Sequence, residues 1–360
     1  MAILREQVMA ALRTIQDPEL FKDIVSLNVV KDVRLDGDEV YVKVELNNPA
    51  SPLKDTIKRD VEAALRRAGA HGVSVEVGSA ARGPAAAAPA PARDVLPQVK
   101  NIIAVGAGKG GVGKSTLALN LAIGLRRNGA AVGLMDGDIY GPSMPTLLGI
   151  KGAAPALHGN KILPFHVHGI YAVTIGALVE QEKPLIWRGP MAHGAFKQLL
   201  LENTEWPSLD YLIVDLPPGT GDVPLTLCQL LPLTGAVVVA TPQQVALDDA
   251  VRAVKMFQQL GAPILGMVEN MSYFVGPDGT EHDIFGRGGT ERAAQRLGLA
   301  YLGALPMFTE VRVNSDAGRP EKNFEGDPKL RAALEAIVTN LAGEVSKRNM
   351  QPAGPSLTIQ

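Results

Sequence analysis

Short apolar segments alternate with amphipathic segments along most of the chain. Between residues 98 and 345 many apolar segments are nearly continuous, which is typical of strands buried on both faces of a sheet. We expect such strands at residues 101–106, 131–136, 171–176, 211–217, 235–242, 264–270 and 301–306. Helical patterns lie between them, for example at residues 114–129 and 246–261. The pattern predicts an α/β fold with a mostly parallel sheet.

The first 80 residues have a different order: helix, strand, strand, helix, strand. Two alternating segments surround an Asp36-Gly37 turn, which favours a hairpin. Ser51 is a candidate N-cap for the second helix, with Pro52 at its first position. We therefore predict a small α+β domain at residues 1–80.

A Pro/Ala-rich stretch follows the small domain and has no amphipathic pattern. Such a composition indicates a semi-rigid, extended linker. We place the linker at residues 81–97, a large α/β domain at 98–345 and a disordered tail at 346–360.

Composition and charge exclude several classes of protein. The net charge of −2 gives no basic excess for nucleic-acid binding. The apolar runs are shorter than the roughly 18 residues of a membrane span, and the N-terminus lacks the apolar core of a secretory signal. The single cysteine, Cys228, excludes an intrachain disulfide. We expect a cytoplasmic protein with no nucleic-acid or membrane partner.

Residues 108–115 fit the phosphate-loop pattern G-x-x-x-x-G-K-[ST], between a predicted strand and a predicted helix. Lys114 is expected to reach the β- and γ-phosphates of ATP, and the Ser115 hydroxyl to take a Mg²⁺ position. A glycine-rich turn without a ligand is the alternative, which the flanking elements disfavour. The expected nucleotide-binding residues here are Gly108, Lys109, Gly110, Gly111, Val112, Gly113, Lys114, Ser115 and Thr116.

A second lysine, Lys109, lies near the start of this loop. It is either a solvated surface charge or a cation supplied across a dimer interface to a neighbour's phosphates. A cation supplied in this way would stabilise transition-state charge as an arginine finger does. Spacing alone does not decide between the two.

Three aspartates follow predicted strands. Asp138 is expected to orient or activate the attacking water, and Asp136 to support the loop and the metal shell; helix capping is the alternative for both. Asp215 ends an apolar strand, where an aspartate of Walker-B type holds Mg²⁺. The expected catalytic residues are Lys109, Lys114 and Asp138, and the expected metal ligands are Ser115 and Asp215.

The run "GKGGVGKST" resembles the deviant phosphate loop of the MinD/ParA/nitrogenase-iron-protein class of ATPases. The runs "MDGDIYGPSMPTLLG" and "IVDLPPGTGD" resemble the Mrp/ApbC family of iron–sulfur cluster carrier ATPases, as do "WRGPM" and "ENMSYF". The small domain, with "DPEL" and "NPASPLKD", is similar to the domain commonly fused in front of bacterial members.

The resemblance implies an ATP-sandwich homodimer in which Lys109 reaches the partner's nucleotide. It implies slow ATP hydrolysis, and apo iron–sulfur proteins or assembly factors as further partners. It also implies that Asn270 hydrogen-bonds adenine; a turn asparagine is the alternative.

One part of the family pattern is missing. Mrp-type proteins generally carry a C-x-x-C after the "ENMSYF" run, and Gly276 and Gly279 stand there instead. Ser51 stands where the small domain often has a cysteine, and Cys228 lies in an apolar helical stretch. Two hypotheses result: a cluster carrier ATPase, or an ATP-switched scaffold or adaptor of the same fold that binds no cluster.

Overall fold

The structure is a computed structural model that describes residues 5–17, 22–26, 29–36, 39–46, 54–79, 95–138, 141–177, 194, 197–276 and 278–350. The contacts divide the chain into two compact units, Met1–Pro89 with Val345–Gln360 and Ala90–Glu344. Ser51, Pro52, residues 81–94 of the predicted linker and residues 351–360 of the predicted tail lie outside the described residues.

The small unit packs two helices on one face of a sheet. Its elements are α1 (Arg5–Leu12), β1 (Gln16–Asp17), β2 (Lys22–Asp23), β3 (Val30–Asp36), β4 (Glu39–Leu46), α2 (Lys54–Arg67) and β5 (Gly72–Ser79). β3 and β4 form an antiparallel hairpin, and β5 pairs in parallel with β4. Leu12, Ile57 and Val42 belong to one buried cluster that joins the helices to the sheet. The β1–β2 pair was not predicted.

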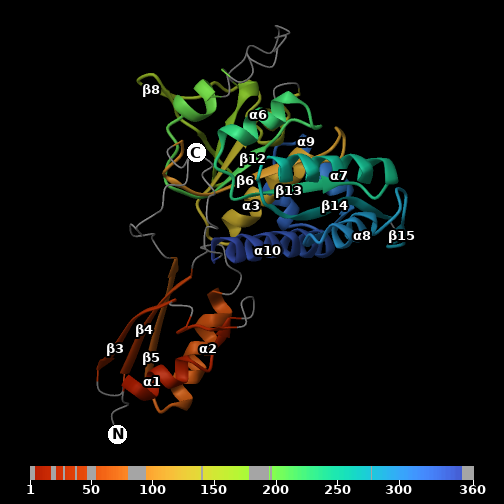
Figure 1. Ribbon diagram of the computed structural model, residues 1–360. Helices are drawn as coiled ribbons and strands as arrows, with labels where there is room; N and C mark the ends of the chain where they lie inside the picture. The colour runs from red at the N-terminus through yellow and green to blue at the C-terminus, as the bar shows by residue number, and fades with distance from the viewer. Residues whose placement is uncertain are drawn as a thin grey trace, which may run out of the picture. The chain divides into compact units, whose positions relative to one another are not determined.

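The large unit is built on a nine-stranded sheet among the described residues (Figure 1). Its strands are β6 (Val99–Gly106), β7 (Val132–Asp136), β10 (Phe165–Val167), β11 (Ile170–Thr174), β12 (Leu209–Asp215), β13 (Gly235–Ala240), β14 (Ile264–Val275), β15 (Glu281–His282) and β16 (Tyr301–Met307). The order is β10-β11-β7-β12-β6-β13-β14-β15, with β16 also paired to β14. Only the pairings of β10 and β15 are antiparallel. The sheet is therefore mostly parallel, as predicted.

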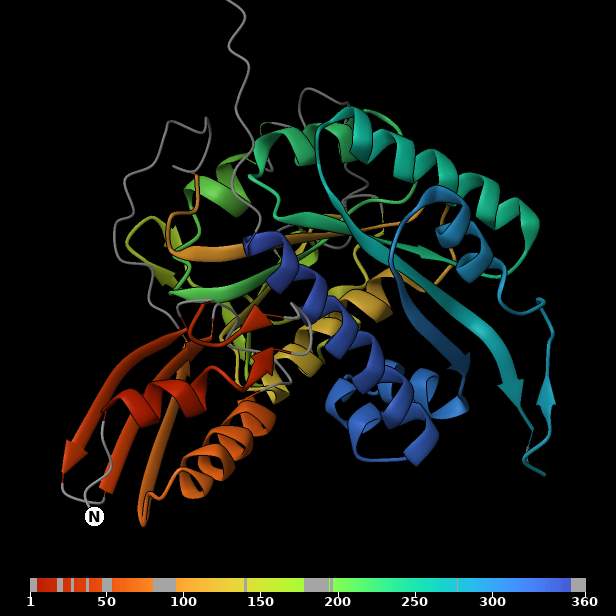
Figure 2. The same ribbon diagram turned by 60° about the horizontal axis from the view of Figure 1, so that its bottom comes forward.

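Helices cover both faces of this sheet, as Figures 1 and 2 show with α7 on one side and α3 and α10 on the other. Strands β7, β12 and β13 are almost entirely buried, which explains their continuous apolar sequence. The helical elements are α3 (Lys114–Arg127), α4 (Met144–Leu147), η1 (Ile175–Ala177), η2 (Lys197–Glu202), α6 (Asp222–Leu230), α7 (Gln244–Gln259), α8 (Gly289–Leu297), α9 (Thr309–Asp316), η3 (Pro320–Phe324) and α10 (Pro328–Met350). A separate two-stranded ribbon pairs β8 (Leu157–His158) with β9 (Lys161–Ile162).

Three neighbouring strands of the sheet end at the same level. Asp215 at the end of β12 is in register with Val105 of β6 and with Asp136 of β7. The segments that leave these strands therefore start side by side, which brings together residues that are about a hundred positions apart in the sequence.

Most predicted boundaries are shifted by one or two residues, and two differ by more. Helix α10 continues to Met350, so the predicted tail at 346–360 begins with helical residues. Val345 and Ser346 are buried, and Lys347 and Arg348 lie in the last turn, where cations stabilise a helix end. Strand β14 runs to Val275, beyond the predicted end at residue 270. Among the described residues no helix has the length and apolarity to cross a membrane.

Candidate nucleotide-binding site

The phosphate loop joins β6 to α3, and its geometry requires glycine at three positions, 108, 111 and 113. Gly111 and Gly113 have φ values of 82° and 79°, which side chains rarely allow. A Cβ on Gly108 would lie 2.1 Å from the backbone of Asp249 in α7. Helix α3 begins directly after Gly113, so its N-terminal N–H groups can bind anions at the loop.

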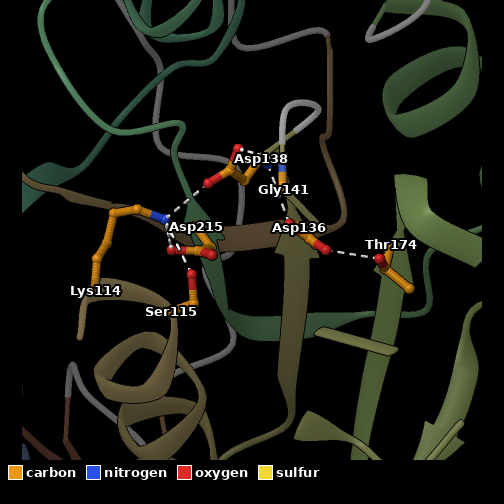
Figure 3. Close-up of polar contacts among 7 residues, drawn as sticks. All are labelled: Lys114, Ser115, Asp136, Asp138, Gly141, Thr174 and Asp215. Atoms are coloured by element: carbon orange, nitrogen blue, oxygen red, sulfur yellow. Dashed lines mark hydrogen bonds and ion pairs between the residues drawn. The ribbon is translucent and has the colours of Figure 1, made fainter. Parts of the chain in front are cut away.

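Lys114 is the centre of a buried polar cluster, shown in Figure 3. Its side chain is only 6% exposed, and its Nζ donates to Asp215 Oδ1 at 2.5 Å. The same nitrogen lies 3.2 Å from Ser115 Oγ and 3.9 Å from Asp138 Oδ2. The structure thus brings together four residues that the sequence placed in the site.

One of the two carboxylate oxygens of Asp215 is available to a ligand. Its side chain is fully buried, and Oδ2 has no hydrogen-bond partner among the described residues. Burial raises the pKa of this carboxyl, and the Lys114 charge opposes that shift. A buried carboxylate oxygen without a partner calls for a ligand. Because carboxylate and hydroxyl oxygens are what Mg²⁺ prefers, Asp215 and Ser115 fit that ion.

Asp136 holds the segment after β7 in place. The hydroxyl of Thr174 donates to its Oδ2 at 2.6 Å, and the backbone N–H of Asp138 donates to its Oδ1 at 3.1 Å. Burial, and secondarily the charge of Asp215, raise the pKa of Asp136 to about 7. Thr174 is a residue that the sequence interpretation missed; its position within the strand predicted at residues 171–176 was the available signal.

Asp138 is buried and accepts a hydrogen bond from the backbone N–H of Gly141 at 3.3 Å. Its other carboxylate oxygen faces Lys114, as Figure 3 shows. The next helix, α4, has Ser143 at its N-cap position, so neither Asp136 nor Asp138 caps it. The helix-capping alternative is therefore wrong, and Asp138 lies where the phosphate loop and the end of β7 meet.

Of the two other expected residues, Lys109 belongs to the loop and Asn270 contacts it from β14. Lys109 is half-buried and has no hydrogen bond or ion pair within the part of the chain that the structure describes. Asn270 of β14 is 8% exposed, and its side-chain Nδ2 donates to the Val112 carbonyl at 2.8 Å. The trans role of Lys109 and the adenine contact of Asn270 stay predictions.

The positions of the missing thiolates form a tight turn between β14 and β15. The Gly276 N–H donates to the Thr280 carbonyl, and the Gly279 N–H donates to the Gly276 carbonyl. Cys228 is buried in α6, and burial raises the pKa of its thiol to about 12. No cluster of three or more His, Cys, Asp or Glu residues suited to a metal ion occurs among the described residues.

This geometry defines a P-loop NTPase, and the comparisons with known proteins agree. The profile of the NUBPL iron-transfer P-loop NTPases matches residues 98–342, and that of the iron–sulfur cluster assembly proteins matches residues 5–77. A nucleotide-binding protein from Archaeoglobus fulgidus, solved with ADP, is 34% identical with a TM-score of 0.58, over 66% of this chain and 93% of that one. The cell-division ATPase MinD of Pyrococcus furiosus shares the fold, with a TM-score of 0.52 at 24% identity, over 69% of this chain and 98% of that one.

Similarity to curated proteins covers nearly the whole chain. The iron–sulfur cluster carrier protein of Deinococcus radiodurans is 46% identical over 99% of this chain and 100% of its own length. The carrier protein of Escherichia coli K12 is 38% identical over 95% of this chain and 92% of its own. The chain therefore belongs to the iron–sulfur cluster carrier family of P-loop NTPases.

Proposed function

We propose that this protein binds and slowly hydrolyses Mg-ATP as a homodimer and serves iron–sulfur cluster assembly or transfer to apoproteins in the cytoplasm. One observation carries the proposal: a buried lysine meets a buried aspartate at the phosphate loop, and one oxygen of that aspartate has no partner among the described residues. They do so in a chain that belongs to the cluster carrier family.

Each residue of the site has a separate role in binding Mg-ATP. Backbone N–H groups of the loop and of the first turn of α3 bind the phosphates of ATP. Lys114 exchanges Asp215 for phosphate oxygens, which frees that carboxylate. Ser115 and Asp215 would hold Mg²⁺, which neutralises the charge on the transferred phosphoryl group.

Hydrolysis converts ATP and water to ADP and phosphate. Asp138, which faces Lys114, orients the attacking water and takes its proton. Lys109 of the second copy would stabilise the charge that develops in the transition state. Its lack of a partner among the described residues supports this role, because such a cation can reach a neighbour's phosphates without first breaking an ion pair in its own chain.

A second candidate function is an ATP-switched scaffold or adaptor that binds no cluster itself. The specific observation in its favour is that the one cysteine of the sequence is buried and has a raised pKa. Cluster iron requires thiolates, typically four for each cluster. A cluster handled by this protein would then need thiolates from a partner.

Anaerobic reconstitution with iron and sulfide tests the two candidates. The full chain and a Cys228→Ala control are incubated alone, and then with ATP and a cysteine-bearing apo-protein. Iron content and visible absorbance are measured on both proteins. ATP-dependent appearance of a cluster on the apo-protein, equal for the two variants, supports the transfer role. Hydrolysis of ATP with no cluster delivered favours the scaffold.

A further inference from the structure

Strand β14 contains a bulge directly beside the phosphate loop. It advances from Asn270 to Phe274 while its partner β16 advances only from Leu305 to Met307, so β14 carries two extra residues. Met271 within this bulge has a φ of 55°. A methionine rarely adopts a positive φ, and such strain persists only where the surroundings impose it.

The residue before the strained position contacts the loop. Asn270 Nδ2 donates to the Val112 carbonyl, and it lies 2.1 Å from the point where a Cβ on Gly113 would be. The asparagine amide therefore fills the space that the glycine leaves. In doing so it fixes the carbonyl between two residues in left-handed conformation, Gly111 and Gly113.

Fixing this carbonyl also fixes a donor of the loop. The Val112–Gly113 peptide is planar and trans, so its C=O and N–H point in opposite directions. Asn270 holds the C=O on its own side, and the Gly113 N–H must face away from it. Phosphate loops bind anions through such oriented N–H groups.

We propose that Asn270 is a positioning residue for the phosphate loop, held in place by the bulge at Met271. This inference rests on the proposed binding of ATP. It differs from adenine recognition, because the hydrogen bond acts on the phosphate-binding backbone whatever base the nucleotide carries.

Binding of three ligands tests the inference. Dissociation constants of Mg-ATP, Mg-GTP and Mg-tripolyphosphate are measured for the full-length wild type, Asn270→Ala and Asn270→Leu. The leucine variant keeps the side-chain volume if alanine destabilises the fold. Loss of one buried hydrogen bond predicts about tenfold weaker binding of all three ligands, with an unchanged ATP-to-GTP ratio. The kcat/KM values for ATP and GTP should fall by the same factor.

Two controls separate positioning from general destabilisation. Asn101→Ala removes a similarly buried amide-to-carbonyl bond, from Asn101 Nδ2 to the Asp210 carbonyl at 2.9 Å, and should leave all three affinities unchanged. Met271→Gly permits the same backbone and should bind as the wild type does. Met271→Val, with a β-branched side chain that disfavours positive φ, should reproduce Asn270→Ala.

Three results would overturn the inference. One is a changed ATP-to-GTP ratio with unchanged tripolyphosphate binding, which would show base recognition. Another is wild-type affinity in both Asn270 variants. A wild type that binds none of the ligands would instead refute the proposed function, and this inference with it.

Discussion

Removing one partner of the buried ion pair between Lys114 and Asp215 should destabilise the nucleotide-free protein far more than breaking an ion pair on the surface does. The two side chains are 6% and 0% exposed. Removing one partner of such a pair leaves an uncompensated buried charge, which costs about 3–5 kcal/mol. The exposed pair of Arg312 and Asp316, at 68% and 66%, is the matched control and should contribute less than about 1 kcal/mol.

A loss of unfolding free energy of this size should lower the melting temperature, Tm, substantially. For a unit of this size about 1 kcal/mol shifts the Tm by roughly 2–4 °C. Lys114→Met or Asp215→Leu should therefore lower the Tm by about 6–20 °C, and Asp316→Ala by less than about 4 °C. The double variant should be less destabilised than the sum of the single variants, because removing both charges leaves neither unpaired.

Urea denaturation without nucleotide of the wild type, the two single variants and the double variant measures the coupling energy, and Asp316→Ala is measured beside them as the control. Both tryptophans of the sequence, Trp187 and Trp206, fall within Ala90–Glu344, so tryptophan fluorescence, excited where tyrosine does not absorb, reports that unit alone. A coupling energy of about 2 kcal/mol or more is expected for groups in direct contact. Additive losses, or single losses no larger than that of Asp316→Ala, would refute the reasoning.

Four further predictions concern Lys109, Asp138, Asp136 and the pair of Gly276 and Gly279. Lys109→Ala should bind ATP but hydrolyse it about 10³-fold more slowly in a phosphate-release assay; wild-type turnover would make Lys109 a solvated charge. Asp138→Asn should bind Mg-ATP nearly normally and accumulate as a closed dimer in sedimentation, and an equal loss of binding would contradict its role. Asp136 has its pKa raised from 3.8 to about 7, so its stabilising effect is complete below about pH 4 and is lost as the pH rises through 7. Urea denaturation at several pH values should show that the free energy of unfolding of the wild type falls by up to about 4 kcal/mol across this pH window relative to that of Asp136→Asn. Parallel pH profiles of the two proteins would contradict the raised pKa of Asp136. The double substitution Gly276→Cys and Gly279→Cys should create iron binding on reconstitution. It should also lower the free energy of unfolding by about 1–3 kcal/mol, because Gly279 has a φ of 80°. An unchanged iron content would mean that the family's two cysteines do not correspond to positions 276 and 279.

The sequence predicts the architecture of the large unit because its signals are local. Strands buried on both faces have continuous apolar runs, and the glycine spacing of the loop is set by the phosphates it cradles. The short strands β8, β9, β10 and β15 escaped prediction. Each has only two or three residues and no periodicity that a pattern could reveal.

Which side chains meet in the site depends on the register between paired strands. A pattern of residues along the chain does not give this register. Asp215 meets Lys114 across 101 positions, and Asn270 meets Val112 across 158. Thr174 reaches Asp136 only because β11 pairs with β7 at that level. The sequence identified the ends of the strands, but only the sheet order shows which side chains at those ends face one another.

The residues expected to bind the nucleotide and the positions expected to bind a cluster lie in different parts of this chain. Lys114, Asp138 and Asp215, which are expected to bind Mg-ATP or act on it, meet at the ends of β6, β7 and β12, and the predicted trans cation, Lys109, would come from a second copy. The positions expected to hold thiolates are glycines in a turn of the β14–β15 hairpin, and the sequence has one buried thiol. We propose that ATP controls association without any cluster on this chain. Its effect should then appear first in the affinity for a cysteine-bearing partner, and only through that partner in iron content.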